Sequence, residues 1–270
     1  MKLKDRVAVI TGAGGGIGRA IALSLARRGC HLSLCDIKEP ELTQVARDAA
    51  ALGVRCTPHP LDVADGAAVA DLPLEVLHAH GKVNLVINNA GVALGGNFDQ
   101  VSEADFDWLM QVNFHGVVRM TRAFLPHLQA ADEGRIVNIS SLYGLVSPPG
   151  QSAYSASKFA VRGFSNALRH ELHGTNVGVT VVHPGGVATS IAKNARVATS
   201  IGAQEAEERL KQVDRLLRMP PQRAGEIIVT GIERNAARIL VGNDAKIVSL
   251  LERIMPVNYW RLLAALTGRP

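Results

Sequence analysis

The chain has 270 residues, of which 47% are hydrophobic and 20% are charged, and its formal net charge is +5 at pH 7. This composition excludes an intrinsically disordered chain, and the length suits one α/β domain. Lysine and arginine are scattered without a long basic run, so we expect no nucleic-acid partner. There is no signal-peptide core after Met1 and no apolar run long enough to cross a bilayer, which predicts a cytoplasmic protein.

The chain contains three cysteines, Cys30, Cys35 and Cys56, and no C-x-x-C pair. Their odd number and the apolar surroundings of Cys35 indicate reduced thiols in the core. Histidine, cysteine and acidic residues do not cluster at metal-ligand spacing, so no metal cofactor is expected.

Short β-rich runs alternate along the chain with longer segments that suit helices. Continuous apolar runs such as residues 7–10 are typical of strands that are covered on both faces. The pattern predicts one domain over residues 1–270, a Rossmann-type doubly wound parallel sheet of about seven strands with helices on both faces. Ligands of such sheets bind beyond the carboxyl ends of the strands. The expected strands cover residues 7–10, 32–35, 55–58, 85–88, 135–139, 178–183 and 238–241.

A glycine-rich segment, T-G-A-G-G-G-I-G at residues 11–18, follows the first expected strand. Glycines let the backbone turn tightly and approach a pyrophosphate, and the start of the following helix favours its negative charge. The spacing is T-G-x-x-x-G-x-G and differs from G-x-G-x-x-G, because Ile17 occupies the place of the last glycine. The predicted phosphate-binding residues are Gly12, Gly14, Gly15, Gly16, Ile17 and Gly18.

The second expected strand runs into Asp36 and Ile37. A carboxylate at this position can accept hydrogen bonds from ribose hydroxyls and would repel a 2′-phosphate. No arginine lies beside Asp36 to hold such a phosphate. The sequence therefore favours NAD over NADP as the cofactor.

Tyr154 and Lys158 stand four residues apart in a segment that suits a helix, which places both on one face. A nearby ammonium favours the phenolate, so we expect a tyrosine pKa lowered toward neutral pH. The pair alone is weak evidence, because an exposed helical pair gives the same pattern. Ser140 and Ser141 follow the strand expected at 135–139, at the predicted ligand-binding edge.

Together these motifs resemble those of the short-chain dehydrogenases/reductases. The likeness covers about residues 5–242 and includes N-N-A-G at 88–91, Y-x-x-x-K at 154–158 and P-G-x-x-x-T at 184–189. The thirteen-residue spacing from Ser141 to Tyr154 also matches the family. The resemblance implies a catalytic set of Asn113, Ser141, Tyr154 and Lys158. It implies further cofactor contacts from Asp62, Val63, Asn89, Ala90, Gly91, Tyr154, Lys158, Pro184, Gly185, Val187 and Thr189.

The resemblance also implies roles for these residues. Asp62 is expected at the adenine edge, Thr189 at the nicotinamide carboxamide, and Asn113 beside a water near Lys158. His183 ends an apolar strand, so we interpret it as a buried residue and not as the catalytic base.

The implied activity is hydride transfer between NAD(H) and an apolar secondary alcohol or ketone, with Tyr154 as the acid/base. The alternatives are an NADPH-dependent carbonyl reductase and a non-catalytic NAD-binding regulator. The expected partners are the small substrate and further copies of the chain, as a homotetramer or dimer. By the resemblance, the main interface uses helices near residues 106–128 and 154–173.

The substrate side and the C-terminal tail carry less specific signals. Residues 190–219 are rich in Ala, Glu, Arg and Leu and are expected to form a helical lid. The tail, 243–270, is strongly apolar, and three interpretations stay open: a subunit interface, a cover for the pocket, or peripheral contact with a membrane. The residues expected to line the pocket are Val92, Leu94, Leu142, Tyr143, Val146, Pro148 and Gly186.

Overall fold

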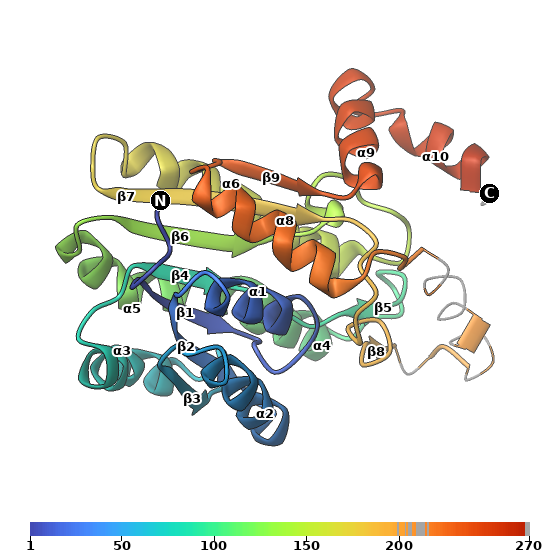
Figure 1. Cartoon of the computed structure of the whole chain (residues 1–270). Coiled ribbons are helices and arrows are strands. Elements are labelled where there is room, and N and C mark those ends of the chain that lie inside the picture. Colours follow the sequence, from blue (N-terminus) through green and yellow to red (C-terminus); the bar gives the residue numbers. More distant parts are fainter. Residues whose placement is uncertain (199, 203, 205–206, 209–213, 215, 268–270) are drawn as a thin grey trace.

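Seven parallel strands form the central sheet in the computed structural model, in the order β3-β2-β1-β4-β6-β7-β9 (Figure 1). Each strand lies within two residues of its predicted range, which confirms the predicted fold class. The structure describes all residues except 199, 203, 205–206, 209–213, 215 and 268–270. The strands are β1 (Val7–Thr11), β2 (His31–Asp36), β3 (Cys56–Pro60), β4 (Leu85–Asn88), β6 (Gly134–Ile139), β7 (Val177–Pro184) and β9 (Arg238–Val241).

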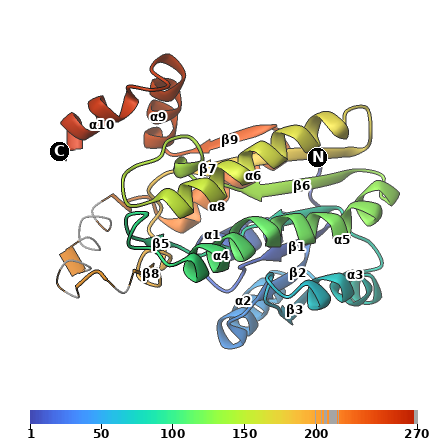
Figure 2. The same cartoon turned by 180° about the vertical axis from the view of Figure 1, so that it is seen from behind.

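Helices cover both faces of the sheet, as the continuous apolar strands require. The residues of β1 are all buried, and Ala8 pairs with Leu32 on one side and with Leu85 on the other. One face carries α1 (Gly16–Ala26), α2 (Glu39–Ala50) and α8 (Pro221–Glu233) (Figure 1). The opposite face carries α3 (Gly66–His80), α4 (Glu103–Met110), α5 (Gly116–Ala130) and α6 (Ser152–Glu171) (Figure 2).

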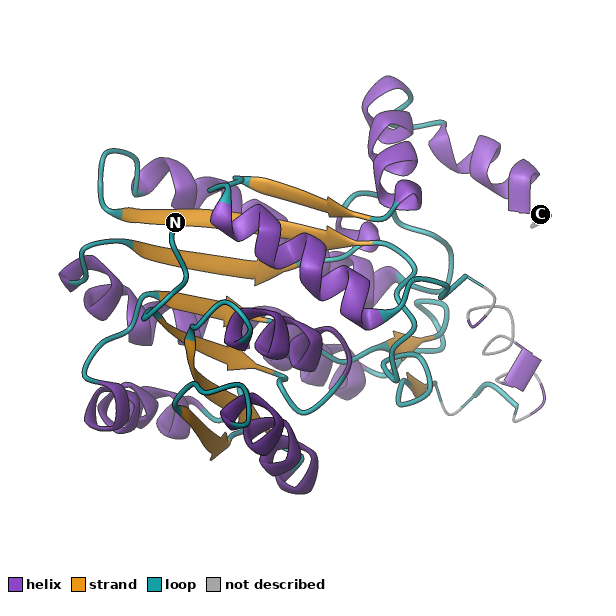
Figure 3. Cartoon of the chain, viewed as in Figure 1, coloured by secondary structure: helices purple, strands orange, loops and turns teal. Residues whose placement is uncertain are grey.

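The chain runs outward from β1 to β2 and β3 and then returns to β4 on the other side of β1. This reversal is the topological switch point at which doubly wound sheets bind ligands. The strand arrows in Figure 3 point to the side where the short strands β5 (Leu94–Gly95) and β8 (Arg196–Val197) lie. The glycine-rich, N-N-A-G and P-G-x-x-x-T motifs and Ser141 follow strands, so they collect at this carboxyl edge.

The helical lid expected over residues 190–219 is wrong where β8 forms. Here the backbone pairs with β5, since Arg196 N donates to Ala93 O at 3.0 Å and Ala198 N donates to Gly95 O at 3.0 Å. The Arg196 guanidinium also stacks on Trp108, 3.6 Å from the ring centroid. Parts of the remaining lid segment lie outside the described residues.

The tail forms two helices, α9 (Asn243–Ile254) and α10 (Tyr259–Thr267), which extend from the end of β9 beyond the sheet (Figure 1). None of the helices in the described ranges is both long and apolar enough to span a bilayer. The thiols of Cys30, Cys35 and Cys56 are free, and only Cys56 is partly exposed.

Candidate active site

The glycine-rich loop is packed so tightly against the end of β4 that several positions admit only glycine. Gly12 has φ +63° and Gly16 has φ +51°, both in the left-handed region. A Cβ on Gly18 would lie 2.0 Å from the carbonyl oxygen of Gly12. Asn89 fixes the loop, because its Nδ2 donates to Thr11 O and Gly12 O, both at 3.0 Å.

The N-terminus of α1 begins at Gly16 within this loop and has free backbone N–H groups. Gly15 is the N-cap, the first turn holds no acidic residue, and no side chain in the described part of the chain caps it. A Cβ on Gly15 would meet no atom within 4 Å. Free backbone N–H groups at a helix start bind phosphate oxygens, so the glycine-rich loop and the start of α1 fit a pyrophosphate. We call residues 12–18 the phosphate cradle.

Asp36 stands at the end of β2 beside the same loop. Its Oδ2 accepts from Gly14 N at 2.8 Å and its Oδ1 accepts from Lys38 N at 3.0 Å. Two backbone donors therefore hold the carboxylate beside the place where an adenosine ribose would extend from the pyrophosphate. Ile37 is 67% exposed and leaves this side of the cradle open.

Asp62 and Val63 follow β3 next to this region, because Leu61 N donates to Asp36 O at 3.0 Å. Asp62 is exposed and its Oδ1 accepts from Ala64 N at 2.8 Å, which fixes the turn. Val63 is buried.

The four predicted catalytic side chains come together at the carboxyl edge. Ser141 follows β6, Tyr154 and Lys158 lie in α6, and Asn113 lies in η1 (Gln111–His115), a π-helical turn between α4 and α5. A Cβ on Gly91 would lie 3.3 Å from Lys158 Nζ and 3.2 Å from Asn113 Oδ1. Single π-turns inside α-helices often mark functional sites.

Asn113 is fully buried, and its side-chain amide forms three hydrogen bonds with Val92 and Ser157. Its Oδ1 accepts from Val92 N at 2.8 Å, and its Nδ2 donates to Val92 O at 3.0 Å and to Ser157 Oγ at 3.1 Å. The amide therefore joins α6 to the loop after β4.

The environment of Tyr154 and Lys158 corrects the predicted direction of the tyrosine pKa. Burial raises the pKa of Tyr154 to about 12, although the hydrogen bond with Ser141 opposes this rise. Burial lowers the pKa of Lys158 to about 8. The Lys158 Nζ lies 5.7 Å from the centroid of the Tyr154 ring and donates to Ile139 O at 3.3 Å. In the chain alone, desolvation of the phenolate outweighs the nearby ammonium.

Two buried side chains fix the backbone around Ser141. Ser140 Oγ donates to Lys158 O at 2.9 Å, which joins the end of β6 to α6. His183 Nδ1 lies 3.0 Å from Ser141 O and, as that oxygen can only accept, Nδ1 carries the proton. Burial lowers the pKa of His183 to about 4, so its ring is neutral and serves as a support.

The P-G-x-x-x-T segment continues from β7 toward the glycine-rich loop. Gly185 N donates to Val241 O at 2.9 Å, and Val187 is buried. A Cβ on Gly16 would lie 3.2 Å from Thr189 Cγ2, so the two motifs face each other across the edge. Pro184 is the last residue of β7.

Apolar side chains surround Tyr154 on the side expected for the substrate. Leu94 is buried with Leu109 and Ala153, and half-buried aromatic rings pack against them. The Tyr143 ring meets the Tyr154 ring edge-on, with 6.0 Å between the centroids. Of the remaining predicted lining residues, Val92 and Leu142 are half-buried, and Val146 and Pro148 are buried.

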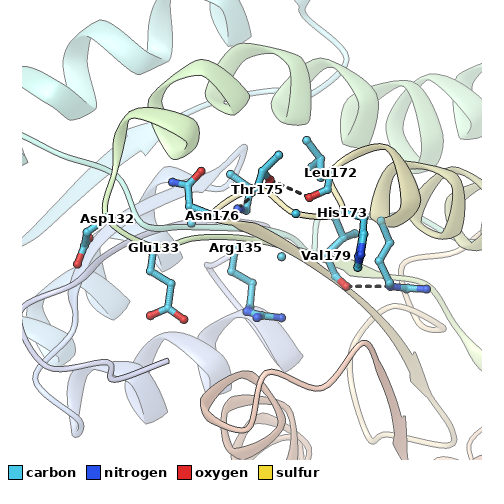
Figure 4. Close-up of a pocket in the computed structure, with 13 residues that line it drawn as sticks. Asp132, Glu133, Arg135, Leu172, His173, Thr175, Asn176 and Val179 are labelled. Atoms are coloured by element: carbon cyan, nitrogen blue, oxygen red, sulfur yellow. Dashed lines mark hydrogen bonds between the residues drawn. The ribbon is translucent and has the colours of Figure 1, made fainter.

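A cavity of about 420 Å³ lies at the opposite, amino-terminal ends of β6 and β7 (Figure 4). Its two arginines are bound by the surrounding protein, since Arg135 Nη1 donates to Thr180 Oγ1 at 3.0 Å and Arg169 Nε donates to Val179 O at 3.2 Å. It contains none of the predicted site residues, and these contacts support the fold.

Two residues near the site carried no sequence signal. Asp244 binds the backbone of Gly186, and Tyr259 binds the backbone of Ser147. Both residues belong to the tail, where no family motif marked them.

Comparisons with known proteins assign the chain to a family. The short chain dehydrogenase family profile matches residues 6–200. Putative oxidoreductase SadH of Mycobacterium tuberculosis is 47% identical over 264 residues, which cover 97% of this chain and 95% of SadH. A short-chain dehydrogenase/reductase of Burkholderia phymatum, solved with NAD, has a TM-score of 0.88 at 30% identity, covering 100% of this chain and 97% of the other. A metagenomic short-chain oxidoreductase solved with NADP has a TM-score of 0.71 at 30% identity, covering 89% and 98%. The chain therefore belongs to the short-chain dehydrogenase/reductase family of oxidoreductases.

Proposed function

We propose that the protein transfers hydride between NAD(H) and an apolar secondary alcohol or ketone, with Tyr154 as the acid/base. The observation that carries this proposal is the convergence of Ser141, Tyr154 and Lys158 at the sheet edge that also holds the phosphate cradle. A non-catalytic NAD-binding regulator would need the cradle but not this second group.

The choice of NAD rests on Asp36. Two backbone N–H groups fix its carboxylate, which suits ribose hydroxyls and disfavours a 2′-phosphate. One related solved structure contains NAD and another contains NADP. The choice between the two cofactors is therefore argued from the residues of this chain and not from its relatives.

The nicotinamide cofactor supplies or accepts the hydride when it is bound. During oxidation, Ser141 Oγ binds the substrate hydroxyl and Tyr154 Oη takes its proton. Lys158 Nζ would hold the ribose hydroxyls of the cofactor, and its positive charge favours the phenolate. During reduction, Tyr154 returns the proton to the substrate oxygen.

The apolar lining favours an apolar substrate. Few polar partners are offered to a substrate by Leu94, Leu142 and Val146. The affinity for different alcohols should therefore depend on how much hydrocarbon surface each one buries, worth about 25 cal/mol per Å². Secondary alcohols with longer alkyl chains should therefore be oxidised with lower KM.

A titration with NADH and NADPH, followed by nicotinamide fluorescence, tests the cofactor assignment. We expect NADH to bind more tightly and the Asp36→Ala variant to lose this preference. Tighter binding of NADPH would instead support the carbonyl reductase, and binding without turnover across a series of secondary alcohols and ketones would support the regulator.

We also propose that copies of the chain assemble through the face formed by α4, α5 and α6 (Figure 2). These helices lie side by side, and Phe159 on α6 is 37% exposed. Assembly as a tetramer, with the tail at a second interface, is the arrangement to test by light scattering. The cytoplasmic location stays a prediction from the sequence.

A further inference from the structure

The two helices of the tail contact two separate parts of the candidate active site, the segment that follows β7 and the loop that follows β6. The first contact is made by Asp244 at the start of α9, and the second by Tyr259 at the start of α10. They reach across 58 and 112 residues of sequence, respectively. The tail thus joins segments that lie far apart along the chain.

Asp244 holds the segment that follows β7. Its Oδ2 accepts from Gly186 N at 2.6 Å, inside the P-G-x-x-x-T motif. Two glycines make room for its carboxylate: a Cβ would lie 2.1 Å from an oxygen of Asp244 on Gly185 and 2.2 Å on Gly242. The glycine at position 185 of this motif is therefore explained, in part, by a carboxylate from the tail.

Tyr259 holds the loop that follows β6. Its Oη accepts from Ser147 N at 3.0 Å, between η2 (Leu142–Gly144) and the start of α6. This loop joins catalytic Ser141 to catalytic Tyr154. Its far end is tied to β5, because Gly96 N donates to Gly150 O at 3.2 Å.

We propose that Asp244 and Tyr259 are positioning residues. Through Asp244 the tail fixes residues 184–189, the nicotinamide-side segment, and through Tyr259 it fixes residues 142–151, the substrate-side loop. This proposal rests on the proposed function, because only that function assigns the segment after β7 to the cofactor and the loop after β6 to the substrate. Neither residue touches the reacting atoms. The tail therefore acts on the site through two backbone hydrogen bonds.

The two contacts have separable consequences. Loss of the Asp244 contact frees Gly186 N and weakens the segment that would hold the nicotinamide, so cofactor affinity should fall. Loss of the Tyr259 contact frees the substrate-side loop, so KM for the alcohol should rise while cofactor affinity stays.

The first experiment measures the NADH dissociation constant of Asp244→Ala and Asp244→Asn by nicotinamide fluorescence. We expect Asp244→Ala to bind NADH about tenfold more weakly, the equivalent of one charge-assisted hydrogen bond. Asp244→Asn keeps an acceptor oxygen and should stay within about twofold of the wild type. Equal affinities for wild type and Asp244→Ala would overturn this half of the proposal, as would equal losses in the two variants.

The second experiment compares Tyr259→Phe with Ser147→Ala, which keeps the backbone N–H that Tyr259 binds. With NAD and 2-octanol, we expect Tyr259→Phe to raise KM about fivefold, with kcat and NADH affinity within about twofold. Ser147→Ala should match the wild type. An unchanged KM in Tyr259→Phe, or an equal rise in Ser147→Ala, would overturn the assignment of Tyr259.

Hydrogen–deuterium exchange of the peptides covering residues 143–150 and 184–189 gives a readout that needs no substrate. Tyr259→Phe should speed exchange in the first peptide, and Asp244→Ala in the second, relative to wild type. If the wild type binds no nicotinamide cofactor and oxidises no alcohol, the proposed function fails. If it does both and neither peptide responds, the positioning role alone fails.

Discussion

Burial controls the chemistry of Tyr154 and Lys158 at the scale of single residues. Desolvation raises the pKa of the phenol and lowers that of the amine, so both shifts favour the neutral groups. In the proposed mechanism, a phenolate at neutral pH therefore needs further positive charge, which an oxidised nicotinamide would supply when bound. We infer that the acid/base is activated when the cofactor binds and not in the chain alone.

Replacement of Tyr154 by phenylalanine tests the acid/base assignment. The variant removes only the hydroxyl, so we expect kcat for alcohol oxidation to fall by about 10²- to 10⁴-fold, the usual contribution of a general base. NADH affinity should stay within about twofold of the wild type, because the cradle is unchanged. Near-normal turnover with intact cofactor binding would show that another group moves the proton.

His183 gives a prediction about stability and pH. Its folded-state pKa of about 4 lies below the unfolded value near 6.5, so the unfolded chain binds the proton more readily. Protonation would place a charge on a fully buried ring whose Nε2 has no partner among the described residues. Stability should therefore fall as pH drops from about 6.5 toward 4.

Urea unfolding of wild type and His183→Asn at pH 7 and pH 5 measures this effect. Asparagine keeps a donor for Ser141 O but does not titrate. We expect the wild type to lose about 2 kcal/mol more than the variant between the two values. His80, whose pKa burial also lowers to about 4, contributes equally to both proteins. Identical losses would mean that His183 is solvated in solution.

The glycine-rich loop and α1 act as one element, in which the tight packing of Gly18 shapes the phosphate cradle. A Cβ on Gly18 would lie 2.0 Å from Gly12 O and 2.6 Å from Asn89 Nδ2, whereas one on Gly15 would meet nothing within 4 Å. The two glycines stand three residues apart in the same motif. They therefore offer a matched pair for separating packing from conformational freedom.

We expect Gly18→Ala to lower the free energy of unfolding by about 1–3 kcal/mol, the usual cost of overpacking. Gly15→Ala should lower it by at most about 1 kcal/mol, because alanine adopts the extended backbone of Gly15 without a clash and is only a poorer N-cap than glycine. Urea titrations of the two variants provide the measurement. Similar losses in both would show that the loop relaxes around the added methyl group.

The strands and the site motifs were predictable from the sequence to different degrees. The strands were predictable because burial on both faces leaves continuous apolar runs, as in β1. The phosphate cradle and the four proposed catalytic residues could be predicted because each motif directly follows a strand or lies at a fixed spacing. Strand β8 was missed, since its two residues are exposed and are defined by pairing with distant β5.

Longer-range features left no local pattern. The roles of Asp244 and Tyr259 depend on backbone donors 58 and 112 residues away. The direction of the Tyr154 pKa shift depends on how many atoms surround the phenol, which spacing along α6 does not reveal. Local motifs thus predict the candidate reacting groups, while burial and tertiary contacts set the environment of these groups.

At the scale of the whole molecule, α9 carries an apolar stripe that none of the described residues of the chain covers. Ile247, Leu250 and Ile254 are 65%, 59% and 68% exposed, and their spacing places them on one face of the helix. Val257, just beyond α9, is 83% exposed. Monomeric proteins rarely expose contiguous apolar patches larger than a few hundred Å², so we expect a second surface to cover these four side chains.

We expect another copy of the chain to cover the stripe, and a Leu250→Lys/Ile254→Lys double variant to test this by light scattering. The added charges should reduce the mass of the assembly, because each lysine would have to be buried without a partner. Leu74→Lys is the control, since Leu74 is 71% exposed on α3, at the other end of the molecule (Figure 1). An unchanged mass in the double variant would reject the interface. Flotation of the wild type, but not of the double variant, with anionic liposomes would then assign the stripe to a membrane surface, because the same side chains would be inserting into lipid.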